Sequence, residues 1–448
     1  MDMYTRAISN IVFPIQERLK RHKTVAYRRR LEASQWLDEA ELKHLQIDNL
    51  RRFLIKVNET NSFYKALFST HGFSPREFSE LSDLQILPFL TKEVIRKNST
   101  AMKSPLIDEL SRFNTGGSSG SPLIFFLGKE RISHDVAAKW RATRWWGVDI
   151  GDREMVVWGS PIELGAQDRV RLLRDKLFRS ELLSAFDLSE ERMGQFIRRI
   201  QRYAPTMIFG YPSVISMLAE YAKERRIDLS SLGVKVVFVT SEKLYDHQRT
   251  IIEEQFCCPV ANGYGSRDAG FIAHECPSGK LHICAEDILV EIVNEKGEVV
   301  PAGEVGEIVV THTATTAFPF IRYKTGDMGA IDTEGCSCGR GLPVLKEVLG
   351  RTTDFVMASD GRLLHGLSLI YVLRDLDGIE AFKIIQNDRL NTRVNIVKNS
   401  SYDENNDARI VKEFRQRLGE SVTVETHYCQ EIEAEKSGKY RYVVSHAH

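Results

Sequence analysis

The sequence predicts an α/β fold with a large, multi-layer N-terminal domain and a small α+β C-terminal domain. Short apolar runs alternate with helical segments between residues 155 and 256, which indicates mostly parallel sheets. Residues 287–332 are rich in β-branched side chains, which favours a small antiparallel sheet. A chain of 448 residues, of which 42% are hydrophobic, can bury the cores of two such domains.

Charge and cysteine content narrow the function classes. Lys and Arg number 61, as do Asp and Glu, so no overall field attracts nucleic acid, and we expect no nucleic-acid partner. No segment reaches the roughly 20 apolar residues of a membrane span, and no signal-peptide pattern begins the sequence, so we expect a cytoplasmic protein. Seven cysteines, an odd number, indicate reduced thiols.

Residues 1–100 are expected to form a helical opening region of the N-terminal domain. Apolar residues recur at helical spacing from Ile8 to Leu19, and again from Leu42 to Val57. Basic residues follow the first of these helices, so contact with a membrane surface is an alternative. A helix packed on the main domain needs the same apolar spacing, and we favour that interpretation.

Residues 101–350 are expected to form the ligand-binding core of the N-terminal domain. The predicted strands are Met155–Trp158, Met207–Phe209 and Val234–Val239, and the predicted helices are Gln195–Tyr203, Ile215–Arg225 and Asp246–Gln255. Each strand ends in a polar or small turn. Because ligands bind beyond the carboxyl ends of parallel strands, these turns are candidate pocket walls. Residues 351–448 are expected to form the C-terminal domain, with helices at Leu367–Leu376 and Asp407–Leu418.

The stretch Asn114–Pro122 is the most informative segment, with three glycines, three serines and no aliphatic side chain. Glycine lets backbone N–H groups converge on an anion, and hydroxyls add donors, which suits a polyphosphate. The residues expected to bind phosphate are Thr115, Gly116, Gly117, Ser118, Ser119 and Gly120. A plain linker has the same composition, so the downstream motifs decide between the two.

Polar segments further along the chain follow the order typical of adenylate-forming enzymes. They are Thr240–Glu242, Asn262–Asp268, Gly306–Glu307, Tyr323–Asp327, Gly350–Asp354 and Ser437–Lys439. With Arg322–Asp327 and Cys336–Pro343, the set resembles the phenylacetate–coenzyme A ligase and CapK-like branch of that superfamily over nearly the whole chain. The resemblance implies activation of a carboxylic acid by ATP and Mg²⁺ as an acyl-adenylate, followed by acyl transfer to coenzyme A.

The resemblance also implies roles for individual residues. Asp327 would accept hydrogen bonds from both ribose hydroxyls, Tyr264 would face adenine, and Asp268 would bind magnesium. The further nucleotide-binding residues are Ser241, Glu242, Gly263, Gly265, Ser266 and Arg351. The acyl pocket would be walled by Trp158, Phe209, Tyr211 and Pro212, which suits an aryl acid.

Lys439 is the expected catalytic lysine, because a cation between a carboxylate and a triphosphate stabilises the charge of the transition state. The resemblance implies that a mobile C-terminal domain delivers it, turning at a hinge formed by Thr353 and Asp354. Leu123, Asp268 and Thr353 depart from the family pattern of lysine, glutamate and a charged hinge residue. Two alternatives therefore stay open: transfer to an amine or hydroxyl in polysaccharide or natural-product biosynthesis, and a non-catalytic nucleotide-binding scaffold.

Cys276, His282, Cys336 and Cys338 have the ligand types of a four-coordinate structural zinc site, and similar cysteines recur in the CapK-like branch. Their spacing is looser than a Cys-x-x-Cys motif, so free buried thiols are the alternative. His274 is a possible substitute ligand.

Overall fold

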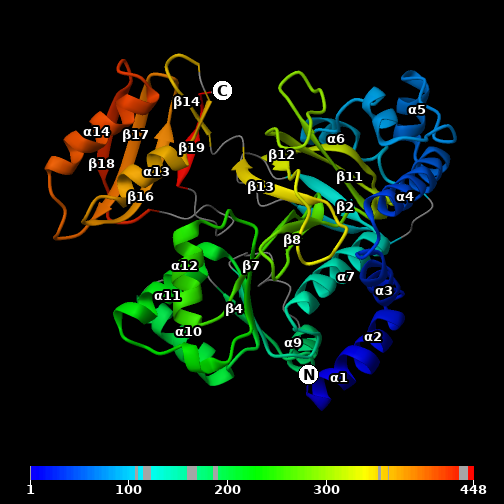
Figure 1. The fold of residues 1–448 in the computed structure, drawn as a ribbon, viewed down its shortest axis with the longest axis horizontal. Coiled ribbons are helices and arrows are strands. Elements are labelled where there is room, and N and C mark those ends of the chain that lie inside the picture. The colour runs from blue at the N-terminus through cyan, green and yellow to red at the C-terminus, as the bar shows by residue number, and fades with distance from the viewer. Residues whose placement is uncertain are drawn as a thin grey trace. The chain divides into compact units, whose positions relative to one another are not determined.

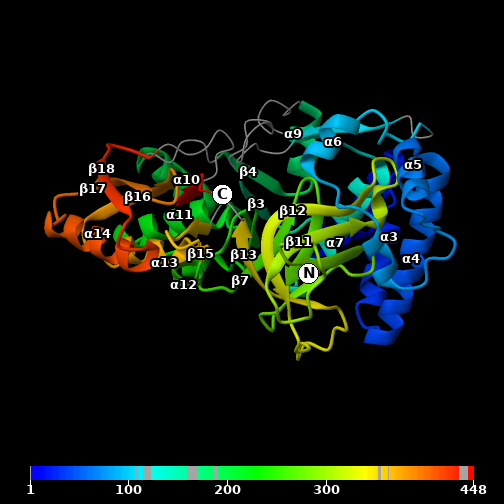
Figure 2. The same ribbon diagram turned by 90° about the horizontal axis from the view of Figure 1, so that it is seen from above.

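The computed structural model describes residues 2–105, 109–114, 123–158, 169–184, 190–351, 355–361, 363–432 and 442–447. These residues divide into two compact units, the first ending at Val348 and the second beginning at Leu349. Figures 1 and 2 show the ribbon from two directions. The first unit contains the large sheet, and the second contains a small sheet with two helices.

Helices make up the start of the first unit, as the apolar spacing predicted. They are α1 (Met3–Ala7), η1 (Ile8–Val12), α2 (Phe13–Leu19), α3 (Thr24–Ser34), α4 (Glu39–Thr60), α5 (Ser62–Thr70), η2 (Leu81–Ile86) and α6 (Lys92–Asn98). Asp38 begins α4 with a capping box, in which its carboxylate accepts from the Glu41 backbone. Leu50, Leu54 and Val57 on α4 are fully buried in the core of the unit.

An eleven-stranded sheet forms the centre of the first unit. In spatial order its strands are β10 (Ile288–Val293), β11 (Gly306–His312), β12 (Phe320–Ile331), β13 (Val344–Arg351), β9 (Leu281–Ile283), β8 (Gly270–Glu275), β7 (Val260–Ser266), β6 (Val236–Thr240), β5 (Met207–Gly210), β3 (Glu154–Trp158) and β4 (Ser180–Ser184). The segment from β4 to β7 is parallel, as predicted. The predicted antiparallel strands continue this sheet, because β7 pairs in parallel with β6 and antiparallel with β8.

Helices cover both faces of the parallel segment. The main ones are α7 (Lys129–Trp145), α10 (Glu190–Tyr203), α11 (Pro212–Glu224) and α12 (Asp246–Phe256). The buried faces of α10, α11 and α12 share a core with one face of β3, β5 and β6, whereas Ala142 of α7 packs on the other face. Figure 1 shows α10, α11 and α12 stacked side by side. All five residues of β6 are buried, as a central parallel strand requires.

The remaining elements of the first unit are short. They are the β1 (Ser111–Asn114) and β2 (Ile124–Leu127) hairpin, α9 (Arg169–Leu177), η3 (Ser230–Leu232) and η4 (Thr313–Thr315). Asn114 pairs with Ile124, so the two strands flank the expected phosphate loop in sequence.

The second unit has its own core and two sheets. Its elements are β14 (Phe355–Met357), β15 (Leu363–His365), α13 (Leu367–Arg374), β16 (Ile379–Gln386), β17 (Asn391–Lys398), α14 (Asn405–Leu418), β18 (Thr423–Tyr428) and β19 (Val443–Ser445). Strands β18, β17, β16 and β19 form one sheet, and buried residues of α13 and α14 pack with it. The predicted helices and α+β class are confirmed. Across the described ranges, no helix is both long and apolar enough to cross a membrane.

Candidate functional site

Tyr264 and Asp327 meet at the predicted nucleotide site. Tyr264 lies on β7 and Asp327 on β12, and the Tyr264 hydroxyl donates to Asp327 Oδ2 at 2.9 Å. Burial, reinforced by the Asp327 charge, raises the pKa of Tyr264 well above its ordinary value, so the phenol remains a donor. Gly326 supplies the left-handed conformation, φ 79°, that turns the chain just before Asp327.

The turn between β7 and β8 is built on glycine and on Asp268. A Cβ atom on Gly265 would lie 2.2 Å from the Gly270 carbonyl oxygen, so only glycine fits this close approach. Asp268 is 6% exposed, and its Oδ2 accepts from the Tyr323 hydroxyl at 2.5 Å. Its Oδ1 accepts from the Ser266 hydroxyl and from the Ala269 backbone at 3.1 Å. Both oxygens of the predicted magnesium ligand therefore already have protein donors.

A buried arginine, Arg131, holds the β7–β8 turn through its backbone. Arg131 on α7 is 1% exposed and donates from Nη1 to the Asp268 carbonyl oxygen at 3.2 Å. Its Nε donates to both carboxylate oxygens of Asp135, at 2.9 and 3.0 Å. Burial would raise the pKa of Asp135, but the charge of Arg131 together with the contacts of His134 and His312 outweighs it and holds this pKa below its usual value. Arg131 thus links α7 to the backbone of the predicted nucleotide site.

Other predicted residues lie at the carboxyl ends of neighbouring strands. Ser241 follows β6 with a left-handed backbone, φ 72°, which is strained for a residue with a side chain. Glu242 Oε2 accepts from the Ser213 hydroxyl at 2.6 Å. The Thr240 hydroxyl donates to the Gly263 carbonyl oxygen at 2.8 Å, which ties the ends of β6 and β7 together. Arg351 ends β13.

The aromatic residues predicted for the acyl pocket form a stack. Trp158 lies 4.4 Å from Tyr211 and 6.1 Å from Phe209, centroid to centroid, with nearly parallel rings. Phe209, Tyr211 and Pro212 are buried, whereas Trp158 is half-buried. The indole N–H of Trp158 has no hydrogen-bond partner among the described residues. Trp158 is therefore the member of the stack best placed to meet a ligand.

Several predicted site residues lie outside the described ranges: the phosphate-loop residues Thr115, Gly116, Gly117, Ser118, Ser119 and Gly120, the hinge residues Thr353 and Asp354, and Lys439. Their roles stay predictions.

The four predicted zinc ligands come together at one point. Their ligand atoms lie within 4.8 Å of one another, with Cys276 Sγ 3.6 Å from Cys336 Sγ and Cys338 Sγ 3.2 Å from His282 Nε2. A tetrahedral zinc site has a sulfur–sulfur edge of about 3.8 Å, so the set fits this ion. His282 Nδ1 lies 3.0 Å from the Leu342 carbonyl oxygen, an outer contact that aims Nε2 at the thiols. His274, the substitute ligand, lies instead 3.6 Å from Cys284 Sγ.

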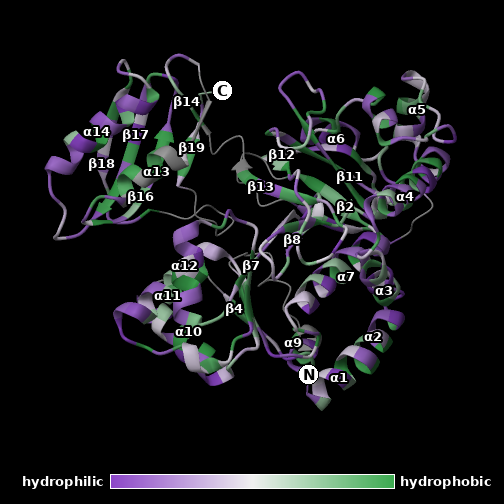
Figure 3. Ribbon diagram, viewed as in Figure 1, coloured by the Kyte–Doolittle hydropathy of each residue, from purple (hydrophilic) through white to green (hydrophobic). Residues whose placement is uncertain are grey.

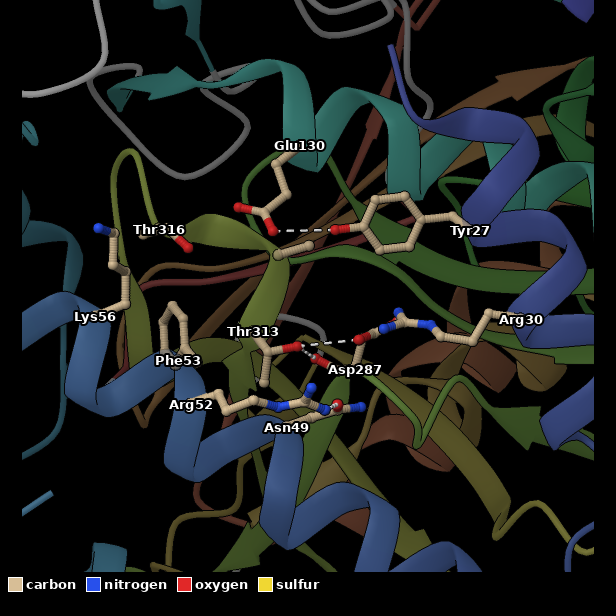
Figure 4. Close-up of a pocket in the computed structure, with 11 residues that line it drawn as sticks. Tyr27, Arg30, Asn49, Arg52, Phe53, Lys56, Glu130, Asp287, Thr313 and Thr316 are labelled. Atoms are coloured by element: carbon tan, nitrogen blue, oxygen red, sulfur yellow. Dashed lines mark hydrogen bonds and ion pairs between the residues drawn. The ribbon is translucent and has the colours of Figure 1, made fainter. Parts of the chain in front are cut away.

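A separate cleft of about 260 Å³ opens between α3, α4, the start of α7 and η4. Figure 4 shows Arg30, Arg52 and Lys56 around it, with the Tyr27 hydroxyl donating to Glu130 at 3.0 Å. Its described lining includes none of the predicted site residues. Asp287 at its base pairs with Arg30 and lies 3.3 Å from His134.

Family models match both units. The model of the AMP-binding enzyme matches residues 183–317, which run from β4 through η4. The model of the CapK C-terminal domain matches residues 356–446. By these two models the chain is similar to AMP-binding enzymes in its first unit and to CapK proteins in its second.

Curated relatives are similar to the chain over most of its length. Protein CapK of Staphylococcus aureus is 26% identical over 417 residues, 90% of this chain and 89% of CapK. The phenylacetate-coenzyme A ligase of Thermus thermophilus is 26% identical over 333 residues, 72% of this chain and 73% of the ligase. A solved 2-hydroxyisobutyryl-CoA ligase in complex with R3-HIB-AMP has a TM-score of 0.74 and 18% identity, covering 92% of this chain and 91% of that one. The fold is that of AMP-forming acid–coenzyme A ligases.

Sequence reasoning missed two arginines that shape the candidate site. Arg131 gave no signal, because the carbonyl oxygens of Arg267 and Asp268 that it contacts are far away in sequence. Arg322 was noted only as the start of a motif, yet it is buried and forms two bonds with Glu291, at 3.1 and 3.0 Å. Its Nη1 also donates to the Leu87 carbonyl oxygen at 2.7 Å, so it anchors the strand that carries Asp327.

Proposed function

We propose that this protein activates a carboxylic acid with ATP, releasing pyrophosphate, and then transfers the acyl group to coenzyme A. The contact between Tyr264 and Asp327 is the observation that carries the proposal. It joins an aromatic ring near the carboxyl end of β7, the side on which α/β sheets bind ligands, to a carboxylate of β12. The phenylacetate–coenzyme A ligase relatives support both the acid class and the acceptor.

Each described residue then has a role that its contacts support. Asp327 accepts hydrogen bonds from the ribose, and Tyr264 holds its carboxylate while presenting a ring face to adenine. Ser241, Glu242, Gly263, Gly265, Ser266 and Arg351 complete the nucleotide site. Trp158 meets the acyl group, and its indole N–H favours an acid that offers an acceptor.

Asp268 is proposed to hold magnesium, which would neutralise phosphate charge during adenylation. The hydrogen bonds that Asp268 already accepts limit how it can bind magnesium. Three donors occupy three of the roughly four lone-pair positions on its two oxygens, so an ion must either share Oδ2 with the Tyr323 hydroxyl or displace a donor from Oδ1. Lys439, delivered by the second unit, is proposed to stabilise the charge that develops as the acid attacks the α-phosphate.

The cysteine and histidine cluster is proposed to hold structural zinc. Four protein ligands leave no open position for water, so the ion would join the β8–β9 hairpin to the β12–β13 connection and take no part in the chemistry.

An amine or hydroxyl acceptor is the alternative to coenzyme A. The CapK match covers more of the chain than the ligase match and includes the second unit, so the ligase relatives alone do not decide the acceptor. A non-catalytic nucleotide-binding scaffold is the remaining alternative.

The test is acid-dependent pyrophosphate release from ATP and Mg²⁺, with a panel of aryl, fatty and hydroxy acids. Lys439→Ala should lower release about a hundredfold or more, the order expected on losing a main transition-state charge. Lys412→Ala, an exposed lysine on α14, is the matched control and should leave release unchanged. Consumption of the coenzyme A thiol identifies the acceptor. Tight ATP binding without turnover for any acid would favour the scaffold.

A further inference from the structure

The first helical run of the chain contains a π turn whose cause is visible in the sequence. Elements α1, η1 and α2 are continuous, and the Phe13 N–H donates to the Ile8 carbonyl, five residues back. Pro14 follows directly, and a proline has no N–H for the regular bond to Asn10 and crowds that carbonyl. The π turn inserts one extra residue into the helical repeat at this point.

The extra residue changes which side chains face the domain. Ile8 and Phe13 now lie on one side and are buried, 2% and 6% exposed. Ile11, Ile15 and Leu19 lie four residues apart on another face and are 58%, 55% and 80% exposed. The expectation that one apolar stripe from Ile8 to Leu19 packs on the main domain is therefore wrong for these three residues.

A second helix with exposed apolar residues, α9, lies beside the first helical run. The Tyr4 hydroxyl donates to the Leu177 carbonyl oxygen of α9 at 2.7 Å, and the ring centroids of Phe13 and Phe178 are 5.8 Å apart. Leu172 and Leu173 on α9 are 52% and 71% exposed. Figure 3 shows hydrophobic and hydrophilic positions together on the α1–α2 run. We call the exposed apolar residues of these two neighbouring helices, Ile11, Ile15, Leu19, Leu172 and Leu173, the N-terminal apolar patch.

Positive charge surrounds this patch. Residues 2–23 and 169–179 contain ten Lys and Arg but three Asp and Glu, in a chain whose charges balance overall. Lys20 and Arg174 are close enough to interact: burial lowers the pKa of Lys20, Glu17 opposes this, and the Arg174 charge adds to the lowering. Like charges held together beside exposed leucine favour an anionic partner with an apolar layer.

We propose that the N-terminal apolar patch binds the surface of an anionic lipid bilayer. Ile11, Ile15, Leu19, Leu172 and Leu173 enter the boundary between headgroups and acyl chains, while Arg18, Lys20 and Arg21 meet lipid phosphate. The helices that carry the patch lie parallel to the membrane plane, as amphipathic helices do at an interface. A second copy of the chain is the weaker occupant, because a two-fold interface would press the same positive surface against itself.

The test is sedimentation of the full chain with sucrose-loaded vesicles. Vesicles of phosphatidylcholine with about a third phosphatidylglycerol are compared with pure phosphatidylcholine, at about 0.05 and 0.5 M salt, because screening weakens surface attraction over this range. Binding to the anionic vesicles should exceed binding to the neutral ones at least tenfold and fall sharply at high salt.

A triple variant tests the apolar part. Ile11→Gln with Ile15→Gln and Leu19→Gln removes only exposed side chains and should lower the partition coefficient at least tenfold with unchanged unfolding. The matched control replaces three exposed apolar residues elsewhere, Met217→Gln, Val305→Gln and Leu390→Gln, and should bind like the native chain.

Three outcomes would overturn the proposal. The first is failure of the native chain to bind anionic vesicles at low salt. The second is equal binding by the triple variant and the native chain. The third is sedimentation velocity that shows a dimer in the native chain and a monomer in the triple variant, since a second copy would then cover the patch. Acid activation is not measured in any arm, so the result does not depend on the proposed function.

Discussion

Replacement of Arg131 by methionine tests how the β7–β8 turn is held. Methionine keeps most of the volume of the side chain but removes its charge and all its donors. The change strands the Asp135 carboxylate, whose two oxygens lie 2.9 and 3.0 Å from Arg131 Nε, and removes the bond to the Asp268 carbonyl oxygen. The first loss leaves a carboxylate on α7 without its partner, and the second removes a tie between α7 and the β7–β8 turn.

The expected cost follows from these contacts. Breaking one side of a buried ion pair costs about 3–5 kcal/mol, and we take about 4 kcal/mol because the Asp135 side chain retains 19% exposure. At a urea slope of about 3 kcal/mol per molar, the midpoint should fall by about 1.3 M. The double variant Arg131→Met with Asp135→Asn removes the stranded charge and should recover about half of the loss, the remainder being the bond to Asp268.

Tryptophan fluorescence in urea is the assay, since all five tryptophans lie in the first unit and report on it alone. Arg202→Met is the control, because this arginine is exposed on α10 of the same unit, and its replacement should leave the midpoint unchanged. A midpoint shift below about 0.3 M for Arg131→Met, or a double variant no more stable than the single one, would refute the reasoning.

Three further predictions concern His312, the cysteine and histidine cluster, and Gly265. Burial, with the Arg131 charge, lowers the pKa of His312 to about 3, so only the unfolded chain takes up this proton below about pH 6.5. The free energy of unfolding should therefore fall on acidification by about 1.4 kcal/mol per pH unit from this group. In urea titrations between about pH 6.5 and 5, His312→Gln should lose less stability than the native chain. Cys338→Ser should lower the zinc content measured by mass spectrometry from one equivalent to well below one, and should lower the melting temperature by several degrees. Cys257→Ser replaces an exposed cysteine and should change neither quantity. Equal zinc content in both variants would contradict the proposed zinc site. Gly265→Ala should weaken ATP binding at least tenfold by calorimetry, because its Cβ collides with a backbone oxygen that cannot move alone, and unchanged affinity would place the nucleotide elsewhere.

The sequence by itself determined the class of fold and the order of its elements. Alternating apolar runs and helical segments identified β3, β5 and β6 with the helices between them, because the pattern of a buried parallel strand is local. The same local logic identified α13 and α14. The four zinc-ligand candidates could also be chosen by residue type, and the structure brings them within 4.8 Å.

Only the tertiary structure decided which contacts join these elements. The antiparallel strands belong to the large sheet because β7 pairs on both edges, a fact set by strand order and invisible in composition. Arg131 and Arg322 became visible as anchors only when partners remote in sequence lay beside them. A single π turn decides which face of the first helix is buried, because one inserted residue rotates every later side chain around the helix axis. The regular helical spacing used in the sequence analysis assumes no such insertion.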